Sequence, residues 1–243
     1  MIYFCGDIHA SFTHLIEVVQ RDRPDGVVLL GDMECGAPLD QILGSIRGLT
    51  QIWFIHGNHD TDRPEFWKHL AESGLAYRNL HGRVVDINGI KVAGLGGVFR
   101  EEIWRPPGTQ NFANYEQFAK AKGRGQPRAA RESQGPEGNR LKHRSTIFPE
   151  TYSALMNQQA DILVCHQAPS CHSEGYAAID ELAVAMGATR IFHGHQHDNL
   201  DYSGWTASTG IEAHGVGLRG ITDEMGQVIV PGEFDAARRY RRK

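Results

Sequence analysis

Short apolar runs alternate with helical patterns over the first part of the chain, and each apolar run ends at a polar or glycine-containing turn. Ile2–Cys5, Val27–Leu30 and Ile52–Ile55 have the length and composition of buried strands in a parallel sheet. Between them, Leu15–Val19 and Leu39–Ile46 place apolar residues at helical spacing. This β-α-β-α-β order requires right-handed crossovers and puts functional loops at the carboxyl ends of the strands. We therefore expect an α/β fold.

The alternation resumes later in the chain, after a hairpin and an interruption. The apolar runs Val84–Ile87 and Ile90–Leu95 flank Asn88-Gly89, which is a strong signal for a tight hairpin turn. Beyond the interruption, the pattern predicts a helix near Pro149–Gln159, a strand at Ile162–Cys165, a helix near Ala177–Met186 and a strand at Arg190–Phe192. Short strands and glycine turns are expected from there to Val230.

The interruption, at about residues 101–147, is basic and poor in apolar residues. The stretch from Lys120 to Arg144 carries eight Lys or Arg and two Glu, although the whole chain has a net charge of −4. Its Gly, Arg and Pro content predicts a flexible insertion. The end of the chain, RRYRRK at 238–243, is a second basic segment. We expect one domain over residues 1–243 with these two basic additions.

Hydropathy and cysteine spacing argue against a membrane-spanning protein and against a disulfide-rich secreted protein. No apolar run approaches the roughly 18 residues that cross a bilayer, so no membrane segment is expected. The N-terminal MIYFC has no basic leader and predicts a strand instead of a signal peptide. The four cysteines have no regular spacing and predict no disulfide framework. A cytoplasmic protein is expected.

Polar side chains that bind metals follow five of the predicted strands. The set consists of Asp7, His9, Asp32, Asn58, His166, His195 and His197. Because the carboxyl ends of neighbouring parallel strands meet at one edge of a sheet, these side chains are expected to converge. Carboxylate, amide oxygen and imidazole suit Mn, Fe, Zn or similar ions, and there are too many ligands for one tetrahedral site. The sequence therefore predicts more than one metal ion.

The ordered pattern DxH, GD, GNHD, H and GHxH resembles the calcineurin-like metallophosphoesterase superfamily over most of the chain, from Asp7 to His197. The resemblance implies two packed mixed β-sheets flanked by helices, a four-layer α/β/β/α sandwich. It also implies a hydrolase of phosphodiesters or phosphomonoesters with two metal ions. We expect Mn or Fe, with Zn and Ni as alternatives. By the resemblance, one ion is bound by Asp7, His9 and His197 and the other by Asn58, His166 and His195, with Asp32 bridging the two.

Two cations about 3.5–4 Å apart clamp the attacking and leaving oxygens of an in-line phosphoryl displacement. A hydroxide held between the metals is therefore expected to attack phosphorus directly, without a covalent enzyme intermediate. By the resemblance, His59, which follows Asn58, is the general acid that protonates the leaving oxygen.

The motif GDMECG distinguishes between branches of this superfamily. Ser/Thr protein phosphatases carry GDxxDRG, whose second Asp orients the catalytic histidine and whose Arg binds phosphate. This chain has Cys35 and Gly36 at those two positions. The motif is closer to the phosphodiesterase type, and both Glu34 and Asp60 are candidates to orient His59. Two alternatives stay open: a Ser/Thr protein phosphatase and a metal-binding scaffold that has lost catalysis.

Contacts to the substrate are expected from residues near the insertion. Arg100, Arg105, His143 and Arg144 border it and are candidates for a cationic lid over the metals. His172, shortly after the ligand His166, is a further candidate to line the pocket. For each of these residues a role in packing or at the surface is the alternative. Such a lid suits a phosphorylated substrate such as a nucleotide, a nucleic-acid end or a phosphoprotein.

Overall fold

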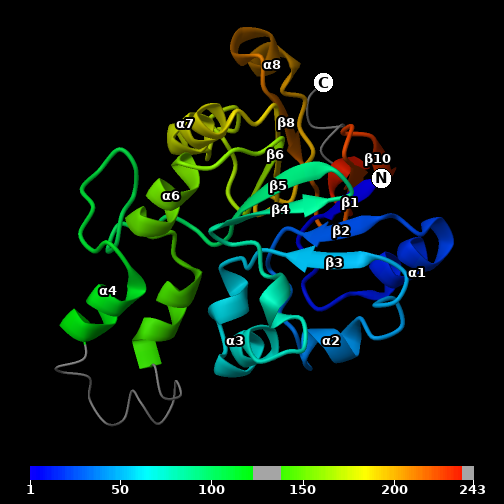
Figure 1. Ribbon diagram of the computed structural model, residues 1–243, viewed down its shortest axis with the longest axis horizontal. Helices are drawn as coiled ribbons and strands as arrows, with labels where there is room; N and C mark the ends of the chain where they lie inside the picture. Colours follow the sequence, from blue (N-terminus) through cyan, green and yellow to red (C-terminus); the bar gives the residue numbers. More distant parts are fainter. Residues whose placement is uncertain (123–137, 237–243) are drawn as a thin grey trace.

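The structure is a computed structural model that describes residues 1–122 and 138–236 (Figure 1). Ten strands of the described residues form two five-stranded mixed sheets. The first sheet has the order β10-β9-β1-β2-β3, with β1 (Ile2–Cys5), β2 (Gly26–Leu29), β3 (Gln51–Phe54), β9 (Ile221–Asp223) and β10 (Val228–Val230). The second has the order β4-β5-β6-β7-β8, with β4 (Arg83–Ile87), β5 (Ile90–Leu95), β6 (Ile162–Cys165), β7 (Arg190–His193) and β8 (Glu212–Gly215).

Each sheet has a parallel centre and antiparallel additions. Strands β1, β2 and β3 run parallel, as do β5, β6, β7 and β8. Strands β9 and β10 pair antiparallel in the first sheet, and β4 pairs antiparallel with β5 in the second. The strands expected from the apolar runs are confirmed to within one residue, and Asn88 and Gly89 both have positive φ in the predicted hairpin turn.

Helices cover the outer face of each sheet. The helices of the described residues are α1 (Thr13–Asp22), α2 (Leu39–Ile42), α3 (Pro64–Ala71), α4 (Tyr115–Lys122), α6 (Pro149–Met156), α7 (Ala177–Met186) and α8 (Ser203–Thr209), with short 3-10 helices η1 (His59–Thr61), η2 (Ala76–Arg78) and η3 (Gly138–Ser145). In Figure 1, α1, α2 and α3 lie on the side of the first sheet, and α6 and α7 on the side of the second. No helix in the described ranges is long and apolar enough to cross a membrane.

Three apolar layers hold the two sheets and their helices together. Along β1, Ile2 and Phe4 point into the core between the sheets, whereas Tyr3 and Cys5 pack toward the helices of the first sheet. The second sheet packs in the same way against α4, α6 and α7. Between the sheets, the rings of Phe4 and Phe192 stack with centroids 3.9 Å apart. The predicted four-layer α/β/β/α sandwich is therefore confirmed.

The helix expected near Leu39–Ile46 is shorter than predicted. Helix α2 ends at Ile42, and the chain continues in turns whose bonds run from the amides of Gly44 and Ile46 to carbonyls three residues earlier. Leu39, Leu43 and Ile46 are nevertheless fully buried. Helical spacing correctly predicted which face is buried, but Gly44 favours ending the helix after one turn.

The described ends of the insertion, which the sequence predicts to be flexible, contain helical segments. One end contains α4 and the other η3. Phe118 of α4 is 2% exposed and packs against His143 of η3, with ring centroids 4.3 Å apart. A few widely spaced aromatic residues therefore fix these ends without a periodic apolar pattern. The middle of the insertion and the basic tail at 238–243 lie outside the described residues.

Replacing the central aromatic residue tests the packing between the sheets. Phe4→Ala is expected to lower the free energy of unfolding by about 3–5 kcal/mol, because it removes a fully buried ring and leaves a cavity beside Phe192. The measurement is denaturant unfolding of the metal-free protein. Val184→Ala on α7, where Val184 is 68% exposed, is the control and should change the free energy of unfolding by less than about 0.5 kcal/mol. Equal effects of the two substitutions would contradict this packing.

Candidate metal centre

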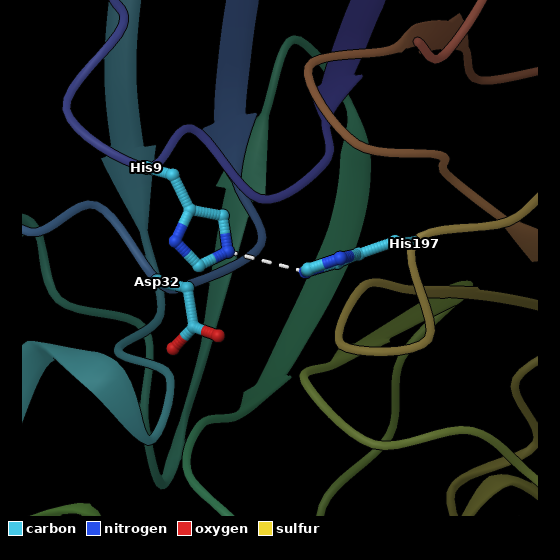
Figure 2. A group of neighbouring side chains, drawn as sticks. All are labelled: His9, Asp32 and His197. Atoms are coloured by element: carbon cyan, nitrogen blue, oxygen red, sulfur yellow. Dashed lines mark hydrogen bonds between the residues drawn. The ribbon is translucent and has the colours of Figure 1, made fainter. Parts of the chain in front are cut away.

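The loops after β1, β2, β3, β6 and β7 meet at one edge of the sandwich and bring the predicted ligands together. Two groups have ligand atoms that all lie within 4.8 Å of one another: His9, Asp32 and His197, and Asp32, His166 and His195. Figure 2 shows His9 and His197 reaching toward each other from different loops, with the Asp32 carboxylate beside them. Their Nε2 atoms are 3.1 Å apart. Asp32 belongs to both groups, so its carboxylate lies between two clusters of imidazoles.

The other two predicted ligands each lie close to a histidine of the cluster. Asp7 Oδ2 is 3.6 Å from His197 Nε2 and accepts a hydrogen bond from the backbone N–H of His195 at 2.7 Å. Asn58 Oδ1 lies 3.1 Å from His166 Nε2. All seven side chains predicted from the strand ends thus converge on one place.

Partners outside the cluster orient two of its imidazoles. His9 Nδ1 is 2.5 Å from a carboxylate oxygen of Glu34, and His166 Nδ1 donates to the carbonyl of Leu30 at 2.8 Å. Each contact engages Nδ1 and leaves Nε2 facing the other ligands. Histidines that bind metals usually have such a partner on the second ring nitrogen, because it fixes the orientation of the ring.

Burial and charge at this cluster fit bound cations. Asp7 and Asp32 are 0% and 1% exposed. Asp7 Oδ1 accepts no hydrogen bond from the described residues, and Asp32 Oδ2 is 3.3 Å from His166 Nε2. Burial, opposed by nearby His166, raises the pKa of the Asp7 carboxyl to about 7. Burial lowers the pKa of His166, but the carboxylates of Asp32 and Asp7 outweigh it and raise that pKa to about 9. The metal-free cluster therefore retains protons, which cations would displace.

The backbone at this edge adopts conformations that side chains rarely take. Of the nine non-glycine residues with positive φ in the described chain, five are at the cluster: His9, Asp32, Glu34, His195 and His197. Such conformations cost on the order of 1–3 kcal/mol each and persist where the surrounding structure enforces them. They let each short loop turn sharply after its strand and direct a side chain back across the sheet edge.

Two positions in the motifs require glycine because ligand side chains lie very close to their backbone. A β-carbon at Gly57 would lie 2.2 Å from Asp32 Oδ1, and one at Gly31 would lie 2.5 Å from His166 Nδ1. Gly31 also has a φ of +106°. These residues precede Asn58 and Asp32 in the motifs, so glycine is needed there for the ligands to pack together.

The two carboxylates expected to orient His59 have other partners. Glu34 contacts His9, as described above. Asp60 is fully buried and accepts hydrogen bonds from the backbone amides of Met33, Glu34 and Gly57 at 2.8–2.9 Å. Asp60 therefore ties the loop after β2 to the loop after β3, and neither residue orients His59.

Asp62, which the sequence analysis missed, is the partner of His59. Its Oδ2 lies 2.6 Å from His59 Nδ1, across the 3-10 turn η1. Burial lowers the pKa of His59, but the hydrogen bond to Asp62 and the charge of Asp32 outweigh it and raise the pKa above its usual value. The spacing of three residues in HDTD was the available signal, because residues i and i+3 share one face of a helical turn.

The five residues expected to contact the substrate differ in burial and in the groups that they contact. Arg100 is half-buried and donates from Nη1 to the Ser145 carbonyl and the Thr146 hydroxyl at 2.9 and 2.8 Å. Burial lowers the pKa of its guanidinium to about 10, and the charges of Asp62 and Asp32 oppose this shift. The other four have these positions: Arg105 is exposed, Arg144 lies over the ring of Tyr115, His143 is buried against Glu102 and Phe118, and buried His172 is 3.5 Å from Asp198.

Comparisons with known proteins agree with this geometry. Residues 1–199 match the family model described as calcineurin-like phosphoesterase. An uncharacterized protein of Haemophilus influenzae is 36% identical over 233 residues, which cover 95% of this chain and 96% of that protein. The crystal structure of TT1561 of Thermus thermophilus shares the fold, with a TM-score of 0.54 and 15% identity over 95% of this chain and 97% of that one. The chain belongs to the calcineurin-like phosphoesterase family, a family of metal-dependent phosphoester hydrolases.

Proposed function

We propose that this protein hydrolyses phosphoesters with a pair of metal ions bound at the cluster. The ligands assigned to the first ion are Asp7, His9 and His197, those of the second are Asn58, His166 and His195, and Asp32 is shared. The observation that carries the proposal is the membership of Asp32 in both groups of close ligand atoms. Nitrogen and oxygen donors of this kind suit Mn or Fe, with Zn and Ni as alternatives.

Bound there, the two ions would supply positive charge to the phosphoryl oxygens and increase the acidity of water. His59 is proposed as the general acid: Asp62 engages its Nδ1, which leaves Nε2 to protonate the leaving oxygen. The side chain of His59 is 43% exposed, so a substrate can reach it. The raised pKa of His59 supports this role, because it favours the protonated ring that a general acid requires.

The substrate class proposed is a phosphodiester, with nucleotides or nucleic acid as candidate sources. Cys35 is fully buried where protein phosphatases have the orienting Asp, and Gly36 stands where they have the phosphate-binding Arg. The discriminating experiment compares bis-p-nitrophenyl phosphate with a phosphopeptide in the presence of Mn²⁺. A preference for the phosphopeptide would support a protein phosphatase instead. We also propose a cytoplasmic location, which the four free cysteines support.

Substitution of the shared ligand tests the metal pair. Asp32→Asn removes a charge and one of the two carboxylate oxygens, so the bound metal is expected to fall from two ions per chain to one or none. Turnover should fall to that of chelator-treated protein. Asp86→Asn, at the exposed hairpin turn, is the matched control and should retain both the two bound ions and the turnover of the wild type. Two ions and full turnover in Asp32→Asn would exclude the shared ligand.

The proposed acid is tested by the dependence of rate on the leaving group. His59→Ala should lower kcat about 10²–10⁴-fold for an alkyl phosphodiester and much less for a p-nitrophenyl ester, whose leaving group needs no proton. Metal content should stay unchanged. In Asp62→Asn, His59 loses the partner that raises its pKa, so the decline of activity with rising pH should begin at a lower pH than in the wild type. Equal losses for both esters would exclude the role of His59 as acid.

Arg100 is the proposed contact for a phosphoryl oxygen. Its Nη1 is bound to Ser145 and Thr146, whereas Nη2 has only a 3.5 Å contact with the Ser145 hydroxyl among the described residues. The guanidinium is thus oriented through Nη1, and the N–H groups of Nη2 can donate hydrogen bonds to a phosphate.

Removal of this guanidinium should weaken the reaction with anionic substrates. A hydrogen bond to a charged group contributes about 1.5–3 kcal/mol, so Arg100→Ala should lower kcat/KM by about tenfold or more. Arg100→Lys should recover part of the loss, and Arg105→Ala, at an exposed position, should have no effect. Steady-state kinetics with bis-p-nitrophenyl phosphate provide the measurement. The same loss in both alanine variants would contradict a specific role for Arg100.

A further inference from the structure

The loop after β1 carries two of the proposed ligands in an unusual conformation. His9 and Ala10 are consecutive residues with positive φ, 41° and 59°. Two adjacent left-handed residues are costly for side chains other than glycine, so the loop must be held by contacts on both sides.

On one side, the loop donates its amides to the loop after β2. The backbone N–H of His9 bonds to the carbonyl of Asp32 at 2.9 Å, and that of Ala10 bonds to the carbonyl of Met33 at 3.0 Å. These two bonds set the distance between the His9 loop and the shared ligand. They use only the donors of the His9 loop. Of its carbonyls, that of Ile8 accepts a hydrogen bond from the backbone N–H of Ser11 at 3.0 Å, and those of Asp7 and His9 need other partners.

On the other side, one residue near the end of the chain binds three successive carbonyls. The backbone N–H of Arg219 donates to Asp7 at 3.1 Å, its Nε donates to Ile8 at 3.2 Å, and its Nη2 donates to His9 at 3.3 Å. Arg219 therefore contacts the main chain of both ligands in the DxH motif and of the residue between them.

Arg219 is itself fixed by its surroundings. Its Nη1 is 2.6 Å from a carboxylate oxygen of Glu233, whose own backbone N–H bonds to the Leu218 carbonyl at 2.9 Å. The preceding backbone packs directly on the end of β1, since a β-carbon at Gly6 would lie 2.3 Å from the Gly217 carbonyl oxygen. The guanidinium thus reaches the His9 loop from a rigid position.

We propose that Arg219 is a positioning residue for the His9 side of the metal centre. The inference rests on the proposed function and extends it, because the family match ends at residue 199 and nothing in it assigns a role to the later segment. Without the guanidinium, the His9 carbonyl loses its bond and the left-handed turn can relax, which moves the His9 ring away from His197. The second ligand group should be unaffected, because His166 is oriented by Leu30.

The test titrates metal-free protein with Mn²⁺ and follows binding by calorimetry and by electron paramagnetic resonance, which distinguishes a coupled pair of ions from a single ion. In Arg219→Ala, the dissociation constant of one ion should rise about 10–100-fold, as for other partners that orient ligands, while that of the other ion stays unchanged. The signal of the coupled pair should give way to that of a single ion. Arg219→Lys should restore part of the affinity, because its ammonium reaches one carbonyl.

A matched control comes from Arg23→Ala. Arg23 also has positive φ, 49°, but its guanidinium bonds to the Gln20 carbonyl at the end of α1. This variant should bind both ions as the wild type does. Hydrogen exchange in metal-free protein adds a readout independent of metal: the amides of His9 and Ala10 should exchange faster in Arg219→Ala and at the original rate in Arg23→Ala.

Three outcomes would overturn the inference. If the wild type binds two ions and Arg219→Ala binds both equally well, the role of Arg219 is overturned and the proposed function stays intact. If both Arg219→Ala and Arg219→Lys weaken the binding of the two ions to the same extent, the substitutions destabilise the protein in general and Arg219 is not a positioning residue. A wild type that binds fewer than two ions would refute the proposed function, and the inference with it. If Arg219→Ala does not fold, the Lys variant decides by the same criteria.

Discussion

The shared carboxylate of Asp32 is the constraint around which this edge of the molecule is organised. It is almost fully buried, it belongs to both groups of potential ligands, and one of its oxygens is 3.3 Å from His166 Nε2. A buried charge of this kind is costly unless opposite charges surround it. The converging imidazoles, the glycines that allow close approach and the strained turns all follow from placing ligands around this one group.

The sandwich supplies the rigidity that such a cluster needs. Ligands come from three strands of one sheet and two of the other, so their separations depend on how the sheets stack. The stacked rings of Phe4 and Phe192 lie between those sheets, and Asp60 connects the loops after β2 and β3. The short loops leave little freedom to each side chain. Precise placement is therefore a property of the whole core and not of the loops alone.

The sequence was most informative where function depends on local spacing. Strand ends followed by Asp, His and Asn were sufficient to predict an α/β fold and the converging ligands, whereas the two packed sheets were predicted from the family resemblance. Prediction was poorer where tertiary contacts determine the partner of a residue. His59 contacts Asp62 instead of Asp60, because the η1 turn directs Asp60 into the core. Arg219 gave no signal, because the carbonyls that it binds in the His9 loop lie far away in the sequence. Helices α4 and η3 depend on isolated aromatic contacts, which periodicity does not reveal.

The pairing of β1 with β9 has a consequence for folding. Cys5 of β1 pairs with Ile221 of β9 in antiparallel register, although the two residues lie far apart in the sequence. Contacts of such long sequence separation form slowly, and until this one forms β1 presents an unpaired edge. Arg219, which binds the carbonyls of the loop after β1, lies directly before β9. The two proposed ligands in that loop therefore reach their final places only after this long-range pairing, which ties assembly of the proposed metal centre to completion of the first sheet.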